Sequence, residues 1–396
     1  MKEINENLDA IANERTQFHL QEVVVVNRVE ISEWRETNSF LNKGDVVYGR
    51  EKDKESIIEQ LVMHASECQG VSVLPIPGIG GLGKTTLAQL VFNDERVIQH
   101  FEPRIWVCVS EDFEVKRVIE AVIGPSCGGS NLQHLQTQLQ DKLNGKRYLL
   151  VLDDVWNENQ EKWDKLKSIL SYGSKGALVI TTTRLEKVAS IMRTLPTHQL
   201  SGLSKEDCWS LFKQGAFQVN NETPNLVVIG KEIVKKCGGV PLAAKALGRL
   251  MHFKIEESEW LRVKESEIWN LPQDDERYIM LALRLSYHNL PSKYRQCFAY
   301  CAIFEKDSKI DKNRVIHLWI ANGFILSNGT KQLEDTANQI WNELYWRSFF
   351  QEVENDDFGN VESFKMHDLV HDLAQSIMEV FGSQSGLRSL ANERLT

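Results

Sequence analysis

Apolar residues from Ile4 to Phe18 recur at intervals of about one or two helical turns among acidic and amide side chains. This spacing predicts an amphipathic helix that must dock on another surface. Gly44 and Asp45 interrupt the pattern, and a second helix is predicted at about 56–65. We therefore expect residues 1–42 to hold a terminal helix and a linker ahead of the first packed unit.

Four short apolar runs follow, separated by stretches with helical periodicity. They lie at 71–76, 105–109, 148–152 and 177–182. Strands that are apolar on both faces and joined by helical crossovers are typical of a parallel sheet with helices on both sides. The first run ends in glycines that lead directly into a helical pattern. The sequence thus predicts an α/β P-loop NTPase domain with a parallel sheet at 43–204.

Helical patterns dominate after Leu203. Ser204 with acidic residues behind it resembles a helix cap, and Pro241 follows two glycines as a helix-opening proline. We expect a helical bundle domain at 205–283. At 284–380, short helices precede two strand-like runs at 349–353 and 361–365, which bracket a turn at 355–360. This order fits a winged-helix domain, followed by a tail at 381–396.

The size and charge of the chain limit its possible functions. At 396 residues and 45.4 kDa, it exceeds what one hydrophobic core usually serves. The formal net charge of −9 argues against a surface built to neutralise nucleic acid or anionic lipid. Segment 284–375 carries ten basic and thirteen acidic residues, whereas a module that reads a DNA groove should be basic. Nucleic-acid binding is therefore not favoured.

The seven cysteines form no C-x-x-C pair, so neither a disulfide framework nor a thiolate zinc site is indicated. The N-terminus has no apolar signal core, and no stretch approaches the ~18 apolar residues of a membrane span. We expect an intracellular, soluble, cytoplasmic protein with reduced thiols.

Residues 78–85 match the pattern G-x-x-x-x-G-K-[ST] between a strand and a helix. Glycines allow backbone N–H groups to turn toward a phosphate, and the helix N-terminus adds partial positive charge. Lys84 would face the outer phosphates, and the Thr85 hydroxyl is suited to Mg²⁺. The residues of the loop predicted to bind nucleotide are Gly78, Gly80, Gly81, Leu82, Gly83, Lys84 and Thr85.

Two further strand ends carry suitable charges. Asp153 and Asp154 end the strand at 148–152, where ligands of open α/β sheets bind. Asp153 would hold the metal, usually through water, and Asp154 would polarise a water for hydrolysis. Arg184 ends the strand at 177–182 and would sense the γ-phosphate of ATP. The alternatives are solvated turn acids and an arginine at the rim of the site.

The order of these motifs resembles the NB-ARC core of plant coiled-coil NLR immune receptors. The resemblance covers nearly the whole chain. Its segments, in family order, are 4–20, 48–51, 78–85, 101–110, 153–156, 182–184, 239–243, 297–301 and 366–368. The chain resembles a family member without most of the coiled-coil domain and without the leucine-rich repeats.

The resemblance implies ADP and ATP, with Mg²⁺, as cofactors. It also implies roles for residues outside the phosphate loop: Val47 and Gly49 flank the adenine, Thr86 helps bind phosphate, Pro241 packs on the base, and His367 reaches the ADP β-phosphate. Arg50 and Leu242 are also expected among the nucleotide-binding residues. Pro241 is equally explained as a helix start. His367 and His371 share the i, i+4 spacing of zinc-protease helices, but Asp368 stands where that signature needs Glu.

The function implied is a molecular switch of plant innate immunity. ADP would hold the chain closed, and exchange for ATP would allow activation and self-association. Any Mg²⁺-dependent ATPase activity would be slow and would serve as a reset. Host or pathogen proteins would bind through regions outside this sequence. Two alternatives are an ATPase whose turnover is the main function and a DNA-binding winged-helix ATPase.

Overall fold

The computed structural model describes residues 39, 46–64, 71–109, 113–124, 131–217, 222–270, 277–325, 332–356 and 358–385. The helix predicted near the N-terminus lies outside these residues. So does the predicted tail from residue 386 onward.

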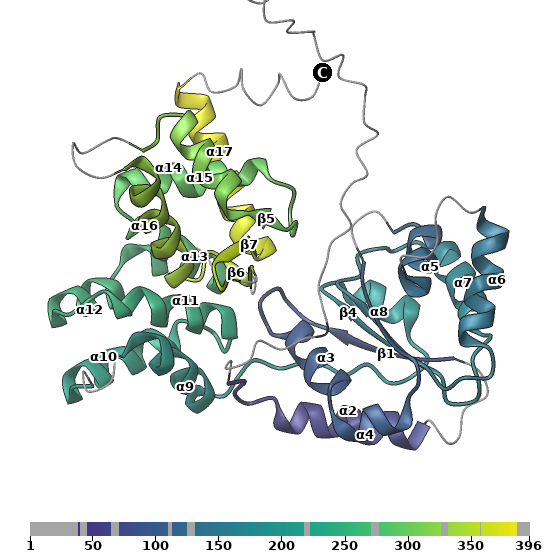
Figure 1. The fold of residues 1–396 in the computed structure, drawn as a ribbon. Coiled ribbons are helices and arrows are strands. Elements are labelled where there is room, and N and C mark those ends of the chain that lie inside the picture. The colour runs from purple at the N-terminus through teal and green to yellow at the C-terminus, as the bar shows by residue number, and fades with distance from the viewer. Residues whose placement is uncertain are drawn as a thin grey trace, which may run out of the picture. The chain divides into compact units, whose positions relative to one another are not determined.

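A four-stranded parallel sheet forms the centre of the first part of the chain (Figure 1). Its strands, in spatial order, are β1 (Ser72–Pro77), β4 (Leu178–Thr183), β3 (Leu149–Asp153) and β2 (Arg104–Cys108). Each lies within one residue of a predicted strand, and the fold class is confirmed. Along the other side of β1, the N–H groups of Leu195 and His198 donate to the carbonyls of Val73 and Pro75.

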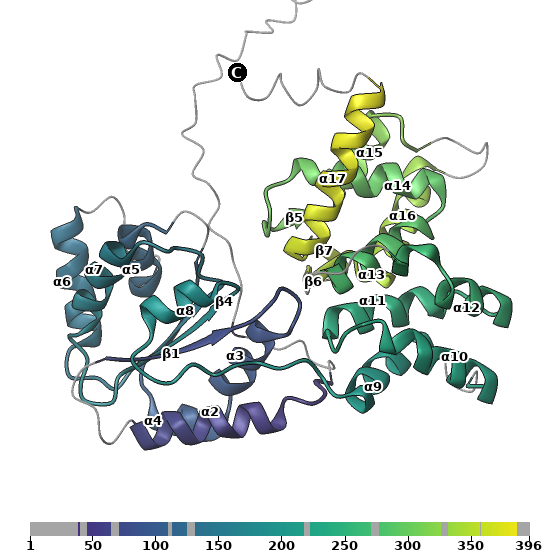
Figure 2. The ribbon, with the colours of Figure 1, turned by 180° about the vertical axis from the view of Figure 1, so that it is seen from behind.

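Seven helices accompany this sheet in the described part of the chain. They are α2 (Glu51–His64), α3 (Lys84–Phe92), α4 (Glu95–His100), α5 (Val115–Ile123), α6 (Leu132–Leu143), α7 (Gln160–Leu170) and α8 (Glu186–Met192). Figures 1 and 2 show α2, α3 and α4 below the sheet and α8 above it. Apolar residues between Ile57 and Leu200 form a core that joins α2, α3 and the strands.

The next part is helical, as predicted. It comprises α9 (Lys205–Ala216), α10 (Pro224–Lys235), α11 (Pro241–His252), α12 (Glu257–Lys264), the 3₁₀ turn η1 (Glu267–Asn270) and α13 (Arg277–His288). The Ser204 hydroxyl caps α9 by accepting from the Asp207 N–H at 3.0 Å. Helices α9 and α11 cross with their backbones in contact, because a Cβ at Gly248 would lie 2.5 Å from the Phe212 carbonyl oxygen.

The last part is the predicted winged helix. Its helical elements are α14 (Ser292–Tyr300), the 3₁₀ turn η2 (Cys301–Ile303), α15 (Lys312–Ala321), α16 (Leu333–Trp346) and α17 (Asp368–Ser385). Its strands are β5 (Ile310–Asp311), β6 (Gln351–Asn355) and β7 (Val361–Lys365), arranged antiparallel in the order β5-β7-β6. Figure 2 shows α17 running along this part.

One strand prediction is displaced. The first strand of the hairpin was expected at 349–353, but β6 begins at Gln351. Phe349 and Phe350 are buried, and the Phe350 ring lies 4.2 Å from Phe364 and 5.8 Å from Trp341, centroid to centroid. These two aromatic residues belong to the core, and the strand starts only after them.

One continuous apolar core extends from Leu203 to Ala374 through both the helical and the winged-helix parts. Ile79 of the phosphate loop packs against this second core and also against the core of the sheet. The described cysteines, Cys108, Cys208, Cys237, Cys297 and Cys301, are buried free thiols, as predicted. Within the described residues, none of the helices has the length and apolar character needed to cross a membrane.

Candidate functional site

The phosphate loop connects β1 to α3, and its backbone conformation requires glycine. Gly81 and Gly83 have φ values of 67° and 93°, which side chains rarely adopt. Lys84 is the first residue of α3 and is buried, and its Nζ donates to the Ile79 carbonyl at 3.0 Å. The ammonium group therefore lies over the loop, next to the N-terminus of α3. This is a favourable place for an anion.

The acidic end of β3 lies beside the loop. Asp153 is fully buried, and its Oδ1 accepts from the Thr85 hydroxyl at 3.0 Å and from the Thr182 hydroxyl at 2.5 Å. Hydroxyl and carboxylate oxygens are ligands suited to Mg²⁺, so this pair fits the ion. The described residues include no group of three or more His, Cys, Asp or Glu side chains that would hold a metal by themselves. A metal bound here would therefore need further ligands, which a bound phosphate would supply.

Arg184, the predicted γ-phosphate sensor, follows β4 and forms an ion pair with Asp368 at the start of α17. Only 10% and 6% of the two side chains are exposed. The guanidinium carbon also lies 5.0 Å from the centroid of the Trp156 ring. From the sequence, Arg184 was assigned to the γ-phosphate and Asp368 was noted only in the family segment 366–368 and in a zinc pattern, so this ion pair was not predicted.

Asp154, the predicted water-polarising carboxylate, has a left-handed backbone with φ of 55°. Its N–H donates to the Thr182 hydroxyl at 2.8 Å, and its Oδ2 accepts from Trp156 Nε1 at 3.0 Å. Thr182 therefore accepts from Asp154 and donates to Asp153, which connects the two acidic residues. The orientation of both carboxylates is fixed by neighbours on β4 and on the loop after β3.

His367 lies directly before α17, and its Nδ1 is 2.5 Å from Asp368 Oδ1. Loss of hydration, together with the nearby positive charges of Arg184 and Lys84, lowers the pKa of this imidazole to about 3. The side chain is therefore neutral near pH 7. The second histidine of the zinc pattern, His371, donates from Nε2 to the Phe304 carbonyl at 2.8 Å, so it holds backbone and not a metal.

A pH dependence follows from the pKa of His367. The ordinary value is 6.5 and the folded value about 3, so between these pH values the unfolded chain binds a proton that the folded chain does not. Acidification therefore destabilises the fold, by about 2 kcal/mol at pH 5. In His367→Gln, the melting temperature of nucleotide-stripped protein should fall about 3 °C less between pH 7.5 and 5 than in the parent. Parallel pH curves would exclude this role for His367.

Two consecutive glycines of the loop touch the second core. The Leu242 N–H donates to the Gly81 carbonyl at 3.3 Å, and a Cβ at Gly81 would lie 2.9 Å from Leu242 Cβ and from Ile279 Cδ1. A Cβ at Gly80 would lie 2.9 Å from Leu369 Cδ1. Helices α11, α13 and α17 therefore meet the phosphate loop directly. In the sequence, nothing distinguishes Ile279 and Leu369 from other apolar residues, so their contacts with the loop could not be predicted.

Arg50 is 3% exposed, and its guanidinium supports the phosphate loop through hydrogen bonds. Its Nη2 donates to the Leu82 carbonyl at 2.8 Å, and its Nη1 donates to the Ser201 carbonyl at 2.9 Å. Gly49, with φ of 67°, faces the Asp207 carboxylate, which a Cβ would approach to 2.5 Å. Val47, Thr86 and Pro241 are half-buried, and their predicted roles at the adenine, phosphate and base stay predictions.

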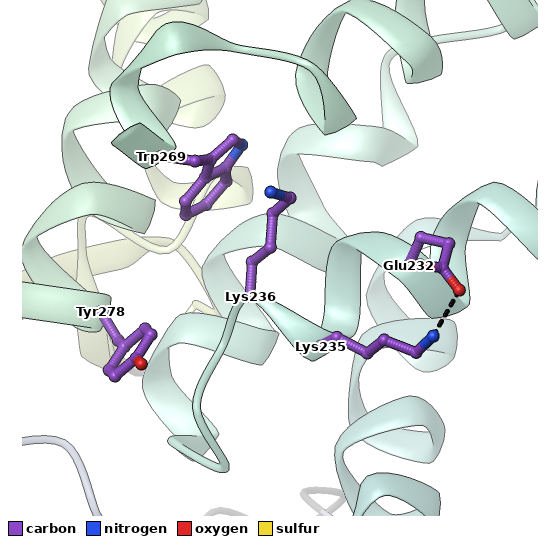
Figure 3. Close-up of a pocket in the computed structure, with 5 residues that line it drawn as sticks. All are labelled: Glu232, Lys235, Lys236, Trp269 and Tyr278. Atoms are coloured by element: carbon purple, nitrogen blue, oxygen red, sulfur yellow. Dashed lines mark hydrogen bonds and ion pairs between the residues drawn. The ribbon is translucent and has the colours of Figure 1, made fainter. Parts of the chain in front are cut away.

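A separate cavity of about 290 Å³ lies in the helical part (Figure 3). Its lining residues are Glu232, Lys235, Lys236, Trp269 and Tyr278. Figure 3 shows Lys236 reaching the Trp269 ring, at 5.4 Å from Nζ to the centroid, and Lys235 paired with Glu232. None of the predicted site residues lines this cavity, so it lies apart from the predicted nucleotide site.

Comparison with known families identifies two domains. The NB-ARC domain family matches residues 50–222, and the "Disease resistance protein Winged helix domain" family matches residues 303–374. Among curated proteins, the chain is 55% identical over 402 residues to the disease resistance protein RGA2 of Solanum bulbocastanum, covering 100% of this chain and 41% of that protein. It is 34% identical over 347 residues to the disease resistance protein RPP13 of Arabidopsis thaliana, covering 84% and 41%.

Among solved structures, the chain is similar to a signal transduction ATPase with numerous domains (STAND) that carries a tetratricopeptide repeat sensor, from Pyrococcus horikoshii. The TM-score is 0.51 at 18% identity, covering 88% of this chain and 44% of that one. This similarity supports the fold alone. The chain spans about two fifths of the length of the curated relatives it matches.

Proposed function

Because the chain belongs to the NB-ARC family of disease resistance proteins, we propose that it is a nucleotide-controlled switch of plant defence, closed by ADP and opened by ATP. The observation that supports this most is the buried ion pair between Arg184 and Asp368. It joins Arg184, the residue predicted to sense the terminal phosphate, to the first turn of α17. The switch would act in the cytoplasm, through domains at 43–204, 205–283 and 284–380.

ADP would stabilise the closed form by adding contacts that only the closed form provides. The loop glycines already meet α11, α13 and α17, and His367 lies within the field of Lys84 and Arg184. A diphosphate on this loop would be bound from the sheet by Lys84 and from the second core by Pro241, Leu242 and His367. A ligand shifts a two-state equilibrium only by its differential affinity, and ~3 to 5 kcal/mol would keep most molecules closed.

ATP would oppose closure through the charge of its terminal phosphate. Arg184 has a carboxylate partner on α17, and a phosphate near the same guanidinium competes for it. Asp368 would then lie buried without its cation, which is unfavourable by several kcal/mol. Separation of α17 from the loop relieves this cost. The surfaces that this separation exposes on α17 and on the loop would then be available for self-association.

Thr85 and Asp153 are the residues that would hold Mg²⁺, which when bound neutralises charge on the phosphate oxygens. Asp154 would orient a water molecule, and Lys84 would hold the outer phosphates. Hydrolysis of ATP at this site would be slow and would return the switch to its closed form. A DNA-binding role finds no support in the acidic balance of 284–375.

The test begins with the nucleotide that co-purifies with the chain, identified by mass analysis, and we expect ADP. Hydrogen exchange at the start of α17 should slow when stripped protein receives ADP and should speed up again with a non-hydrolysable ATP analogue. In Asp368→Asn, the protection by ADP should fall about tenfold or more, because Arg184 loses its buried partner. Equal exchange with ADP, with the ATP analogue and without nucleotide would refute the switch.

A further inference from the structure

Trp156 contacts two charged side chains that the proposed switch uses. Its indole Nε1 donates to Asp154 Oδ2 at 3.0 Å, and its ring faces the Arg184 guanidinium at 5.0 Å from the guanidinium carbon to the ring centroid. Asp154 comes from the end of β3 and Arg184 from the end of β4. One half-buried side chain therefore contacts both the predicted water-orienting carboxylate and the predicted phosphate sensor.

The charge distribution of an indole suits both contacts. The N–H edge is positive and hydrogen-bonds to a carboxylate, whereas the ring face is negative and attracts a cation. Asp154 and Arg184 carry opposite charges, and both act electrostatically on His367, so they occupy the same small region.

The backbone around Trp156 is fixed to β4 on the side of Arg184. The Val155 N–H donates to the Thr182 carbonyl at 2.8 Å, and the Thr183 hydroxyl donates to the Val155 carbonyl at 2.6 Å. These bonds fix Val155, the residue before Trp156, relative to β4, the strand that precedes Arg184. The position of the ring is thus tied to both strand ends.

We propose that Trp156 is a positioning residue of the switch, whose N–H holds Asp154 for hydrolysis and whose ring face holds Arg184 for its contact with Asp368. This inference rests on the proposed nucleotide switch. It assigns separate roles to two parts of one side chain, and two substitutions separate them.

Trp156→Phe keeps an aromatic face and removes the N–H donor. Single-turnover ATP hydrolysis should fall about tenfold, while release of a fluorescent ADP analogue stays within about twofold of the parent. Trp156→Gln keeps an N–H donor and removes the face. Release of the ADP analogue should then rise about fivefold, with a smaller effect on hydrolysis, because Arg184 loses its support and the ion pair with Asp368 weakens.

Trp346→Phe is the matched control, since Trp346 is exposed at the end of α16 and contacts none of the predicted site residues within the described chain. Both rates should equal those of the parent. A merely structural role for Trp156 would move both rates together in both variants, and that result overturns the inference. If instead the parent itself retains no nucleotide, the proposed function fails. If the parent binds ADP and the two variants behave alike, only the role of Trp156 fails.

Discussion

Lys84→Ala is expected to lower the affinity for ADP and ATP at least about a hundredfold, so that the protein purifies without nucleotide. The Lys84 ammonium is buried beside the N-terminus of α3 and hydrogen-bonds to the loop itself at Ile79. It is therefore held in place before the phosphate arrives, and little side-chain entropy is lost on binding. A preorganised cation on a phosphate contributes about 1.5–3 kcal/mol per charged hydrogen bond, and two such bonds account for the expected loss.

The measurement is the molar ratio of nucleotide to purified protein, together with titration of a fluorescent ADP analogue. Lys165→Ala is a suitable control, because Lys165 is exposed on α7 and the same charge is removed away from the loop. The control should bind like the parent. Stoichiometric ADP in purified Lys84→Ala would show that the loop at 78–85 is not the phosphate site.

Gly81→Ala is expected to separate the phosphate loop from the second core and to speed ADP release about tenfold or more. The new methyl group would meet Leu242 Cβ and Ile279 Cδ1 at 2.9 Å, closer than packed carbon atoms approach. Ile279 and the neighbouring side chains are buried in a continuous core and have little room to move. The strain is relieved most easily by moving α11 and α13 away from the loop.

Gly145→Ala provides an unusually close control for this variant. Gly145 has the same φ of 67°, but nothing lies within 4 Å of an added Cβ. Both variants carry the cost of about 1 kcal/mol for alanine in a left-handed conformation, and only Gly81→Ala adds the contact with the second core. ADP release and hydrogen exchange in α17 should therefore change in Gly81→Ala alone. Equal changes in both variants would indicate that backbone strain, and not the contact between the parts, explains the effect.

The elements predicted best from sequence are those determined by local chemistry. The four strands were visible as apolar runs, the Ser204 cap as a local donor–acceptor pattern, and the phosphate loop as a motif with a backbone requirement. Each depends on residues within a few positions of one another. The shifted start of β6 has the opposite origin, because Phe349 and Phe350 are placed by packing against Phe364 and Trp341.

Several contacts that the sequence did not predict join distant positions. Arg184 and Asp368 form an ion pair across half the chain, and Arg50 donates to the carbonyls of Leu82 and Ser201. No local pattern encodes these partners, because a charged residue near a strand end is compatible with solvent, phosphate or protein. From the sequence, Arg50 was placed only among the nucleotide-binding residues. The structure adds that its guanidinium supports the phosphate loop.

The continuous core from Leu203 to Ala374 has a consequence for how the proposed switch can be adjusted by substitution. Since the helical and winged-helix parts share one interior, a destabilising substitution inside it should weaken both parts together and lower the amount of folded protein. Substitutions at the contacts of this core with the phosphate loop and with Arg184 should instead change the equilibrium between the closed and open forms in small steps. Natural variation that changes how readily the switch opens should therefore occur at these contacts and leave the interior unchanged.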